Sequence, residues 1–262
     1  MSERQTVRDA IVLAGGRGQR MAPFTSVLPK PLLPIGDRPI LEILLRQLAQ
    51  SGVEQVHLAV GYLSQLVESY FGDGSRFGVH LTYHREEEPL GTAAPIRFVA
   101  DGLRGSGALP PSFFVLNGDL LMDVDFAALA ARHGSGTLSI LVAEREHRVD
   151  LGVLEIDGAG RLVDYVEKPV HHYHVSTGVY VFPQVAVARI TPGRRLDFPD
   201  LVRDMLRDGF PVHPVHLRDV GSLWMDLGRP EDYERGCRLF EEAPERFLPA
   251  AQASGDVPPP RL

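Results

Sequence analysis

The sequence is poor in cysteine, in long apolar runs and in net positive charge. A single cysteine, Cys237, excludes an intramolecular disulfide and fits a reducing compartment. No run approaches the roughly 18 apolar residues of a membrane span, and the charged N-terminus MSERQTVRDA lacks the apolar core of a signal peptide. The net charge of −7 disfavours nucleic acid and anionic membranes, which attract basic faces. These absences predict a cytoplasmic protein that binds neither nucleic acid nor membrane.

Lysine is also scarce, since 25 of the 27 basic residues are arginine. The two lysines, Lys30 and Lys168, are each followed by proline, in PKPLLP and VEKPV. A compact ammonium reaches a phosphate oxygen where a guanidinium fork would not fit, and the adjacent proline stiffens the backbone that carries it. We therefore interpret both lysines as candidates for phosphate contacts; the alternative is two surface lysines beside common prolines.

The 262 residues alternate between apolar, β-branched segments and segments of helical period. This alternation predicts an α/β fold, with a Rossmann-like, mostly parallel (mixed) sheet and helices on both faces. The segment GVLEIDGAGRLVDYVEK predicts a β-hairpin around Asp157 to Gly160, an extension that could hold a second substrate. From about Ala243 the chain is rich in proline and alanine, so we expect one domain over residues 1–242 and a flexible tail over 243–262.

The first predicted strand, DAIVLAGG, leads into a glycine-rich loop. Gly15, Gly16 and Gly18 follow the strand, where backbone N–H groups can approach an anion unhindered. A dinucleotide-binding loop would have glycine at position 21, but this chain has Met21. The Walker pattern is absent as well, because no Gly-Lys-Ser/Thr occurs. The loop therefore matches neither standard phosphate loop.

The same loop is long, basic and rich in proline. We expect its prolines to keep the chain extended to about residue 38 instead of letting a helix start. Such a loop fits a bulky triphosphate, with Arg17 and Arg20 near the phosphates and Lys30 approaching from the far end. The prolines are Pro23, Pro29, Pro31 and Pro34.

The stretch LAGGRGQRM…LPKPLLPIGDRPILE resembles the signature of the sugar-1-phosphate nucleotidyltransferases, and the resemblance covers residues 9 to about 240. It implies attack by a sugar 1-phosphate oxygen on the α-phosphorus of a nucleoside triphosphate, with release of pyrophosphate. It also implies a homo-oligomer, because the family commonly forms dimers or tetramers. Four further motifs follow in the family's order: LGTA at Leu90–Ala93, NGD at Asn117–Asp119, EKP at Glu167–Pro169 and WMDLGRPEDY at Trp224–Tyr233.

The resemblance assigns roles to residues at these motifs. Arg20, Lys30 and Asp119 match the family's catalytic positions. Asp119 and Asp226 are expected to hold Mg²⁺, which takes one or two carboxylates together with phosphate oxygens; the alternatives are a turn aspartate and a helix-entry residue. Nucleotide contacts are implied for Leu13, Ala14, Gly15, Gly16, Arg17, Gly18, Gly91 and Thr92. Contacts with the sugar phosphate are implied for Gly152, Glu167, Lys168 and Gly178.

Some positions depart from the family pattern. Gln19 and Met21 stand where threonine and leucine are usual, and Ser176–Gly178 lacks a common asparagine, which bears on sugar preference. The histidines that precede it suggest either a loop that lines the sugar pocket or a metal site. These histidines are His171, His172 and His174.

The motifs most resemble the mannose-1-phosphate guanylyltransferase branch, which implies GTP with a mannose-, heptose- or cyclitol-type 1-phosphate. The alternatives are thymidylyl, uridylyl, cytidylyl or adenylyl transfer to a hexose 1-phosphate. A non-catalytic paralogue that binds nucleotide sugars would have lost Lys30, Arg20 or Asp119, all of which are present. A glycosyltransferase would use an Asp-x-Asp motif, for which Asp123–Asp125 is a candidate. A nicotinamide-dependent oxidoreductase is disfavoured by the loop.

Overall fold

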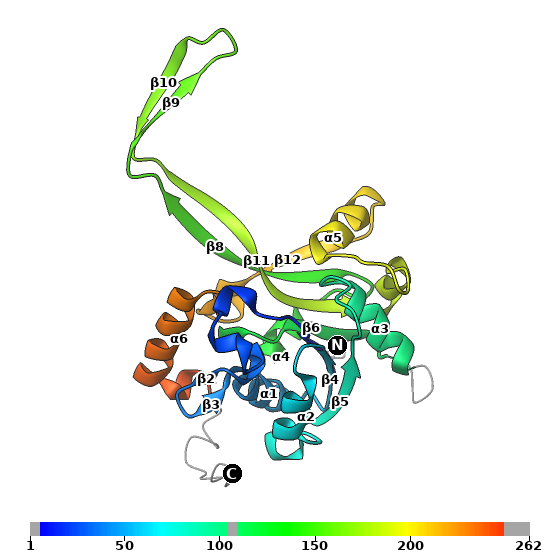
Figure 1. Cartoon of the computed structure of the whole chain (residues 1–262). Helices are drawn as coiled ribbons and strands as arrows, with labels where there is room; N and C mark the ends of the chain where they lie inside the picture. The colour runs from blue at the N-terminus through cyan, green and yellow to red at the C-terminus, as the bar shows by residue number, and fades with distance from the viewer. Residues whose placement is uncertain (1–5, 104–108, 249–262) are drawn as a thin grey trace.

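A seven-stranded mixed sheet forms the centre of the computed structural model, which describes residues 6–103 and 109–248 (Figure 1). The strand order is β12-β8-β11-β6-β1-β4-β5. Strands β6, β1, β4 and β5 are parallel, whereas β11 runs antiparallel to its neighbours β6 and β8. The predicted mostly parallel sheet is confirmed. Its strands are β1 (Asp9–Ala14), β4 (Gln55–Val60), β5 (His80–Arg85), β6 (Ser112–Asn117), β8 (Leu138–Arg148), β11 (Val170–Pro183) and β12 (Val212–His216).

Helices cover both faces of this sheet, as the alternating sequence predicts. In β1, Val12 faces the cluster with α1, α2 and α4, whereas Ile11 faces the cluster with α3 and α5. Burying one such side chain contributes about 1.5–3 kcal/mol, which explains the continuous apolar run of β1. The helices are α1 (Ile40–Gln50), α2 (Ser64–Phe71), α3 (Ala94–Gly102), α4 (Phe126–Ala131), α5 (Phe198–Arg207) and α6 (Pro230–Glu242). None of those described has the length and apolar content to cross a bilayer.

A third apolar cluster lies under α6 and joins the opening loop to the end of the chain. Phe247 and Leu248 are buried in it, so packing extends past residue 242, where the sequence suggested a loose tail. The remainder of that tail, 249–262, lies outside the described residues. Four short strands belong to this region: β2 (Pro34–Ile35), β3 (Arg38–Pro39), β7 (Leu120–Met122) and β13 (Trp224–Asp226).

Short 3₁₀ turns fill several of the connections between these elements, three of them in the opening loop. They are η1 (Gln19–Met21), η2 (Phe24–Ser26), η3 (Lys30–Leu32), η4 (Ser75–Phe77), η6 (Gln184–Arg189), η7 (Leu217–Asp219) and η8 (Pro244–Arg246).

Strands β8 and β11 continue beyond the sheet as a two-stranded ribbon that projects from the body (Figure 1). The predicted hairpin, β9 (Gly152–Ile156) and β10 (Leu162–Glu167), forms its tip. We call residues 146–172 the arm. Its length was not predicted, because both faces of the ribbon are exposed and the sequence shows no alternation of buried and exposed residues.

Candidate active site

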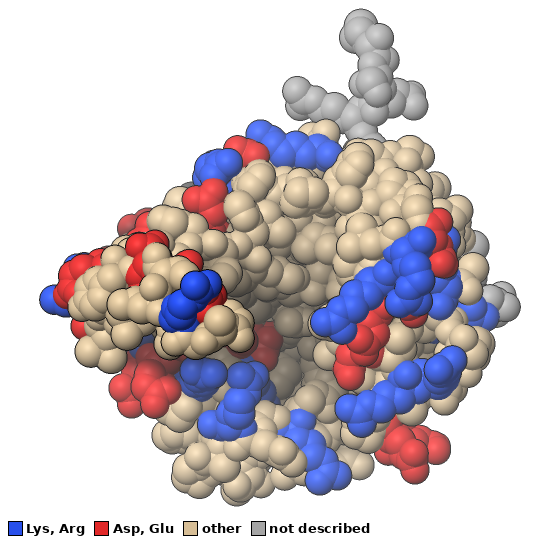
Figure 2. Space-filling model, turned by 90° about the horizontal axis from the view of Figure 1, so that it is seen from above, with Lys and Arg blue, Asp and Glu red and all other residues tan. Residues whose placement is uncertain are grey.

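A cleft of about 540 Å³ opens at the carboxyl ends of β1 and β6. Open α/β sheets bind ligands at this edge. Figure 2 shows a deep hollow between the arm and the rest of the molecule, with lysine and arginine side chains along its edge. Eleven of the sequence-predicted site residues line the cleft: Leu13, Ala14, Gly15, Gly16, Arg17, Gly18, Arg20, Lys30, Gly91, Thr92 and Asp119.

The glycine-rich loop is held in place by a contact between Gly18 and Thr25. Gly18 adopts a left-handed conformation (φ 61°), and its carbonyl oxygen accepts a hydrogen bond of 2.9 Å from Thr25 Oγ1. A Cβ at this position would lie 2.8 Å from the Thr25 side chain, so only glycine fits. The loop does not run into an α-helix, as predicted, but it is folded into η1, η2 and η3 and is not extended. A proline φ of about −65° is compatible with such turns.

Lys30, Asp119 and Asp226 meet at one end of the cleft. Lys30 is buried, and its Nζ donates to Asp119 Oδ2 and lies 3.8 Å from Asp226 Oδ1. Asp119 precedes β7 and Asp226 ends β13, and the antiparallel pairing of these two strands brings the aspartates together. The structure thus places these predicted residues side by side, although 107 positions separate the two carboxylates.

Asp226 lies among charged groups and is partly buried. Burial and the nearby Asp119 carboxylate raise the pKa of Asp226, while Lys30 and Arg20 act in the opposite direction. Asp226 Oδ1 accepts no hydrogen bond. Two adjacent carboxylates with an unused oxygen match the ligands that a divalent ion takes. The donor set therefore fits a metal ion held by Asp119 and Asp226.

The segment with Gly91 and Thr92 is anchored to the start of α5. The Thr92 amide donates to Asp197 Oδ1 at 3.1 Å, and Thr92 Oγ1 accepts from the Phe198 amide at 2.8 Å. These bonds fix the wall of the cleft opposite the glycine-rich loop and leave the Gly91 backbone at its surface.

Sequence analysis missed Glu86, which follows β5 and lines the cleft. Burial raises the pKa of Glu86 to about 7. Its Oε1 is buried without a hydrogen bond, and its Oε2 would lie 2.8 Å from a Cβ added at Gly15. The run Glu86-Glu87-Glu88 reads as a solvated charge cluster, so nothing in the sequence marks the first glutamate as buried. Asn117 and Gly228 also line the cleft and were not predicted.

The residues predicted to contact the sugar phosphate do not line this cleft. Gly152, Glu167 and Lys168 lie on the arm, and their hydrogen bonds and ion pairs stay within it. Lys168 adopts a left-handed conformation (φ 47°), which a non-glycine residue rarely does. Gly178 lies where β11 leaves the sheet, next to the Asn117 side chain at the rim of the cleft.

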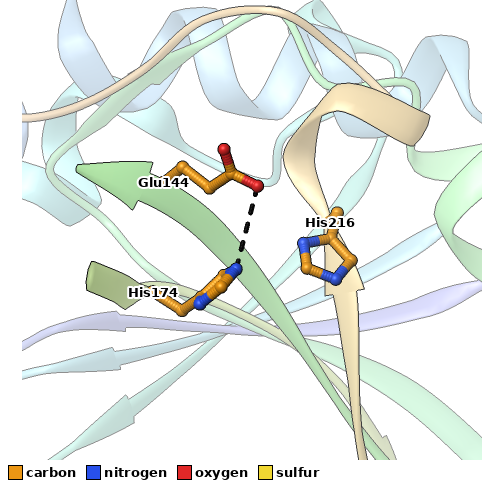
Figure 3. Close-up of side chains that lie close together, drawn as sticks. All are labelled: Glu144, His174 and His216. Carbon is orange, nitrogen blue, oxygen red and sulfur yellow. Dashed lines mark ion pairs between the residues drawn. The ribbon is translucent and has the colours of Figure 1, made fainter. Parts of the chain in front are cut away.

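The histidines before Gly178 lie on β11 and not in a loop. His174 lies near Glu144 of β8 and His216 of β12 on one face of the sheet (Figure 3). His174 Nε2 is 3.7 Å from Glu144 Oε1, but the same oxygen accepts a hydrogen bond from Arg218. This group is a surface ion-pair network at the base of the arm, in which Arg218 already holds the carboxylate.

Asp123 and Asp125, the Asp-x-Asp candidate, both have structural partners. Asp123 accepts hydrogen bonds from the Ser222 amide at 2.8 Å and from Arg246 Nε at 2.6 Å. Asp125 caps α4, accepting from the Ala128 amide at 2.9 Å. Neither lines the cleft, so the glycosyltransferase alternative loses the residues on which it depended.

A glycine-rich loop, a buried lysine and two converging carboxylates on a Rossmann-like sheet define a protein class that handles nucleotide phosphates. The sequence matches the nucleotidyl transferase family over residues 9–242, and the chain belongs to this family.

Three relatives illustrate the match. A mannose-1-phosphate guanylyltransferase of Mycobacterium tuberculosis is 36% identical over 87% of this chain and 63% of its own length. A UTP–glucose-1-phosphate uridylyltransferase of Synechocystis is 31% identical over 87% and 62%, so the chain spans under two thirds of both. The structure of HddC from Yersinia pseudotuberculosis with GMP-PN shares the fold, with a TM-score of 0.66 at 24% identity over 89% of this chain and 100% of that chain.

Proposed function

We propose that this protein is a sugar-1-phosphate nucleotidyltransferase that joins a sugar 1-phosphate to a nucleoside triphosphate and releases pyrophosphate. The observation that carries the proposal is the cluster of Lys30, Asp119 and Asp226 beside the Gly15–Gly18 loop. A sugar 1-phosphate is already anionic near neutral pH and needs little acid–base help. The chemical problem is to bring two polyanions together in line, which calls for positive charge and positioning.

In this reaction an oxygen of the sugar phosphate forms a bond to the α-phosphorus. The bond from the α-phosphorus to the oxygen that bridges to the β-phosphate breaks, and pyrophosphate leaves with that electron pair. Lys30 and Arg20 stabilise the charge on the transferring and leaving phosphates. The amides of Gly15, Gly16 and Gly18 orient the triphosphate by hydrogen bonds.

Nucleotidyltransferases of this family generally use a divalent metal ion, and we propose Mg²⁺ here. Asp119 and Asp226 would hold it, in keeping with the unused oxygen and the raised pKa of Asp226. When bound, the ion would neutralise charge on the phosphate oxygens. Lys30 forms ion pairs with both carboxylates.

We propose GTP as the nucleotide, because of Glu86. The Watson–Crick edge of guanine presents two adjacent donors, N1–H and the 2-amino group, which a carboxylate accepts together. Glu86 offers an unused carboxylate on the wall of the cleft. Thymine, uracil and cytosine lack this pair of donors. The acceptor would be a mannose-, heptose- or cyclitol-type 1-phosphate.

Uridylyl transfer to a hexose 1-phosphate is the second candidate, favoured by the similarity to the Synechocystis enzyme. One assay separates the candidates: pyrophosphate release with Mg²⁺, in which GTP, ATP, CTP, UTP and dTTP are crossed with mannose, glucose and heptose 1-phosphates. The proposal predicts release with GTP and one sugar phosphate together, and none with either alone. Release with UTP in preference to GTP would overturn the choice of base, and silence over the whole grid would overturn the proposed reaction for these acceptors.

A further inference from the structure

The arm has an apolar face that none of the residues described by the structure covers. Across the β9–β10 hairpin, Tyr165 pairs with Leu154 and Leu162 with Ile156, so these four side chains lie on one face of the ribbon. They are 49–64% exposed. Isolated two-stranded ribbons are marginally stable in water, and an uncovered apolar face of this size marks a contact surface.

Two of the residues predicted to contact the sugar phosphate, Gly152 and Glu167, lie on the same face. Glu167 pairs with Gly152 at the end of the apolar stripe, and Tyr165 Oη donates to Glu167 Oε2 at 3.2 Å. A Cβ at Gly152 would lie 2.2 Å from Tyr165 Oη, so glycine is what lets the ring lie across the strand. Lys168 follows directly. Whatever covers the apolar stripe therefore also meets these polar groups.

The arm holds this face away from the cleft of its own chain (Figure 1). The β8–β11 ladder runs from Val170 opposite Arg148 to Ser176 opposite Val142 and, after a register shift between Ser176 and Tyr180, continues within the sheet, so the arm extends the sheet outward. Lys168 and Gly178, at the rim of the cleft, are ten positions apart, roughly 30 Å along an extended strand. The cleft therefore lacks Glu167 and Lys168 unless another molecule supplies them.

The rim of the cleft presents surfaces that complement the arm. The loop next to Gly18 exposes Phe24, Val27 and Leu28, of which Val27 is 71% exposed. Thr25 ties this loop to Gly18 at the cleft. Arg17 and Arg20, both exposed, add positive charge beside it. The segment 149–169 of the arm, by contrast, carries five carboxylates and two basic groups. Figure 2 shows basic side chains around the hollow.

We propose that two copies of this chain exchange arms, so that each cleft is completed by Glu167 and Lys168 of the other copy. Both halves of the contact, the apolar acidic arm and the apolar basic rim, are present on one chain. Such a self-complementary pair closes as a two-fold dimer in which each contact is made twice. The inference rests on the proposed function for the role of Lys168, but the exchange of arms can be tested without activity.

The activity-free test measures mass and hydrogen exchange. Sedimentation should give a dimer for the wild-type chain and a monomer for Leu154→Glu/Ile156→Glu. A chain with Leu206→Glu, an equally exposed leucine on α5, should remain a dimer. Amides of residues 24–28 and 151–167 should exchange faster in the monomeric variant than in the wild type. A monomeric wild-type chain, or a dimer in which neither segment is protected, would overturn the exchange of arms.

The second test is complementation between chains. Asp119→Asn inactivates the cleft of one copy, and Lys168→Ala inactivates the arm of the other copy. Co-expression with different tags and purification on both gives the mixed dimer. With exchanged arms, this dimer has one intact site of two and about half the wild-type activity, whereas each parent has almost none. If the mixed dimer stays at the parental level, each arm serves its own cleft and the proposal is wrong. If the wild type itself releases no pyrophosphate, the proposed function fails, and the first test still decides the exchange of arms.

Discussion

The body of the molecule and its arm each contain half of one predicted site, and the two halves differ in burial. In the body, Lys30 is buried and in contact with Asp119 at the end of the cleft. On the arm, Glu167 and Lys168 are exposed and contact only the arm itself. A preorganised cleft suits a nucleoside triphosphate, whose negative charge has to be neutralised before reaction. An exposed ribbon suits the sugar 1-phosphate if this substrate is enclosed only when the ribbon packs against another copy of the chain.

The largest expected effect concerns the body. Asp119→Asn removes one carboxylate charge from the predicted metal site, and we expect kcat for pyrophosphate release to fall about 100- to 1,000-fold. Asp125→Asn is the matched control, because asparagine caps a helix as well as aspartate does. That variant should keep the wild-type rate and melting temperature. Equal losses in both variants would mean that Asp119 is only a turn residue.

A smaller effect is expected at Glu86. Glu86→Gln replaces the carboxylate that would accept both guanine donors, so KM for GTP should rise about 10-fold, the size of one hydrogen bond to a charged group. KM for ITP, which lacks the 2-amino group, should change less. Glu87→Gln, at the exposed neighbour, should leave both values unchanged. An equal rise for GTP and ITP would show that Glu86 does not contact the 2-amino group, and an unchanged KM for both would remove Glu86 from base recognition.

The same residue should make GTP binding depend on pH. Because burial raises the pKa of Glu86 to about 7, its carboxyl group is largely protonated at pH 6 and ionised at pH 8. GTP should therefore bind more tightly as the pH rises through 7. The stability of the protein without ligand should depend on pH in the opposite direction. The pKa of Glu86 is higher in the folded than in the unfolded chain, so its contribution to the free energy of unfolding is complete below about pH 4.5 and is lost as the pH rises through 7. Calorimetry and thermal unfolding of wild type and Glu86→Gln between pH 5 and 8 would check both slopes.

The smallest effect is expected on the arm. Tyr165→Phe removes the hydroxyl that donates to Glu167, an exposed bond, and should raise KM for the sugar phosphate about 2- to 3-fold. KM for GTP should stay the same. Tyr173→Phe, at another exposed tyrosine on the same ribbon, serves as the control. A change in KM for GTP alone would contradict the proposal that the arm binds the sugar phosphate and the body binds the nucleotide.

Much of the body was predictable from the sequence, for a physical reason. Buried strands and amphipathic helices leave a clear hydrophobic period, and the residues predicted to bind the anion in the glycine-rich loop lie within 18 positions, from Leu13 to Lys30. The convergence of Asp119 and Asp226 depended on the family resemblance. The pairing of β7 with β13 that achieves it involves three residues on each strand, too few to leave a pattern in the sequence.

The direction of the arm and the state of Glu86 were not predictable. An exposed ribbon has no buried face, so His171 to His174 read as a loop although they extend β11. Glu86 differs from Glu87 and Glu88 only in its burial beneath the glycine-rich loop, which depends on how β5 packs beside β4. In both cases tertiary placement, and not local sequence, decides the role.

The central claim is that the body binds the nucleotide and the arm binds the sugar phosphate. The most direct test is to titrate the Lys168→Ala variant with each substrate separately. The account predicts that Kd for GTP, measured by calorimetry with Mg²⁺, equals the wild-type value, while Kd for the sugar 1-phosphate rises about 10- to 100-fold through the loss of a charged hydrogen bond. Arg161→Ala, at another basic residue of the arm, should change neither. Loss of GTP binding in Lys168→Ala, or wild-type binding of the sugar phosphate, would contradict the account.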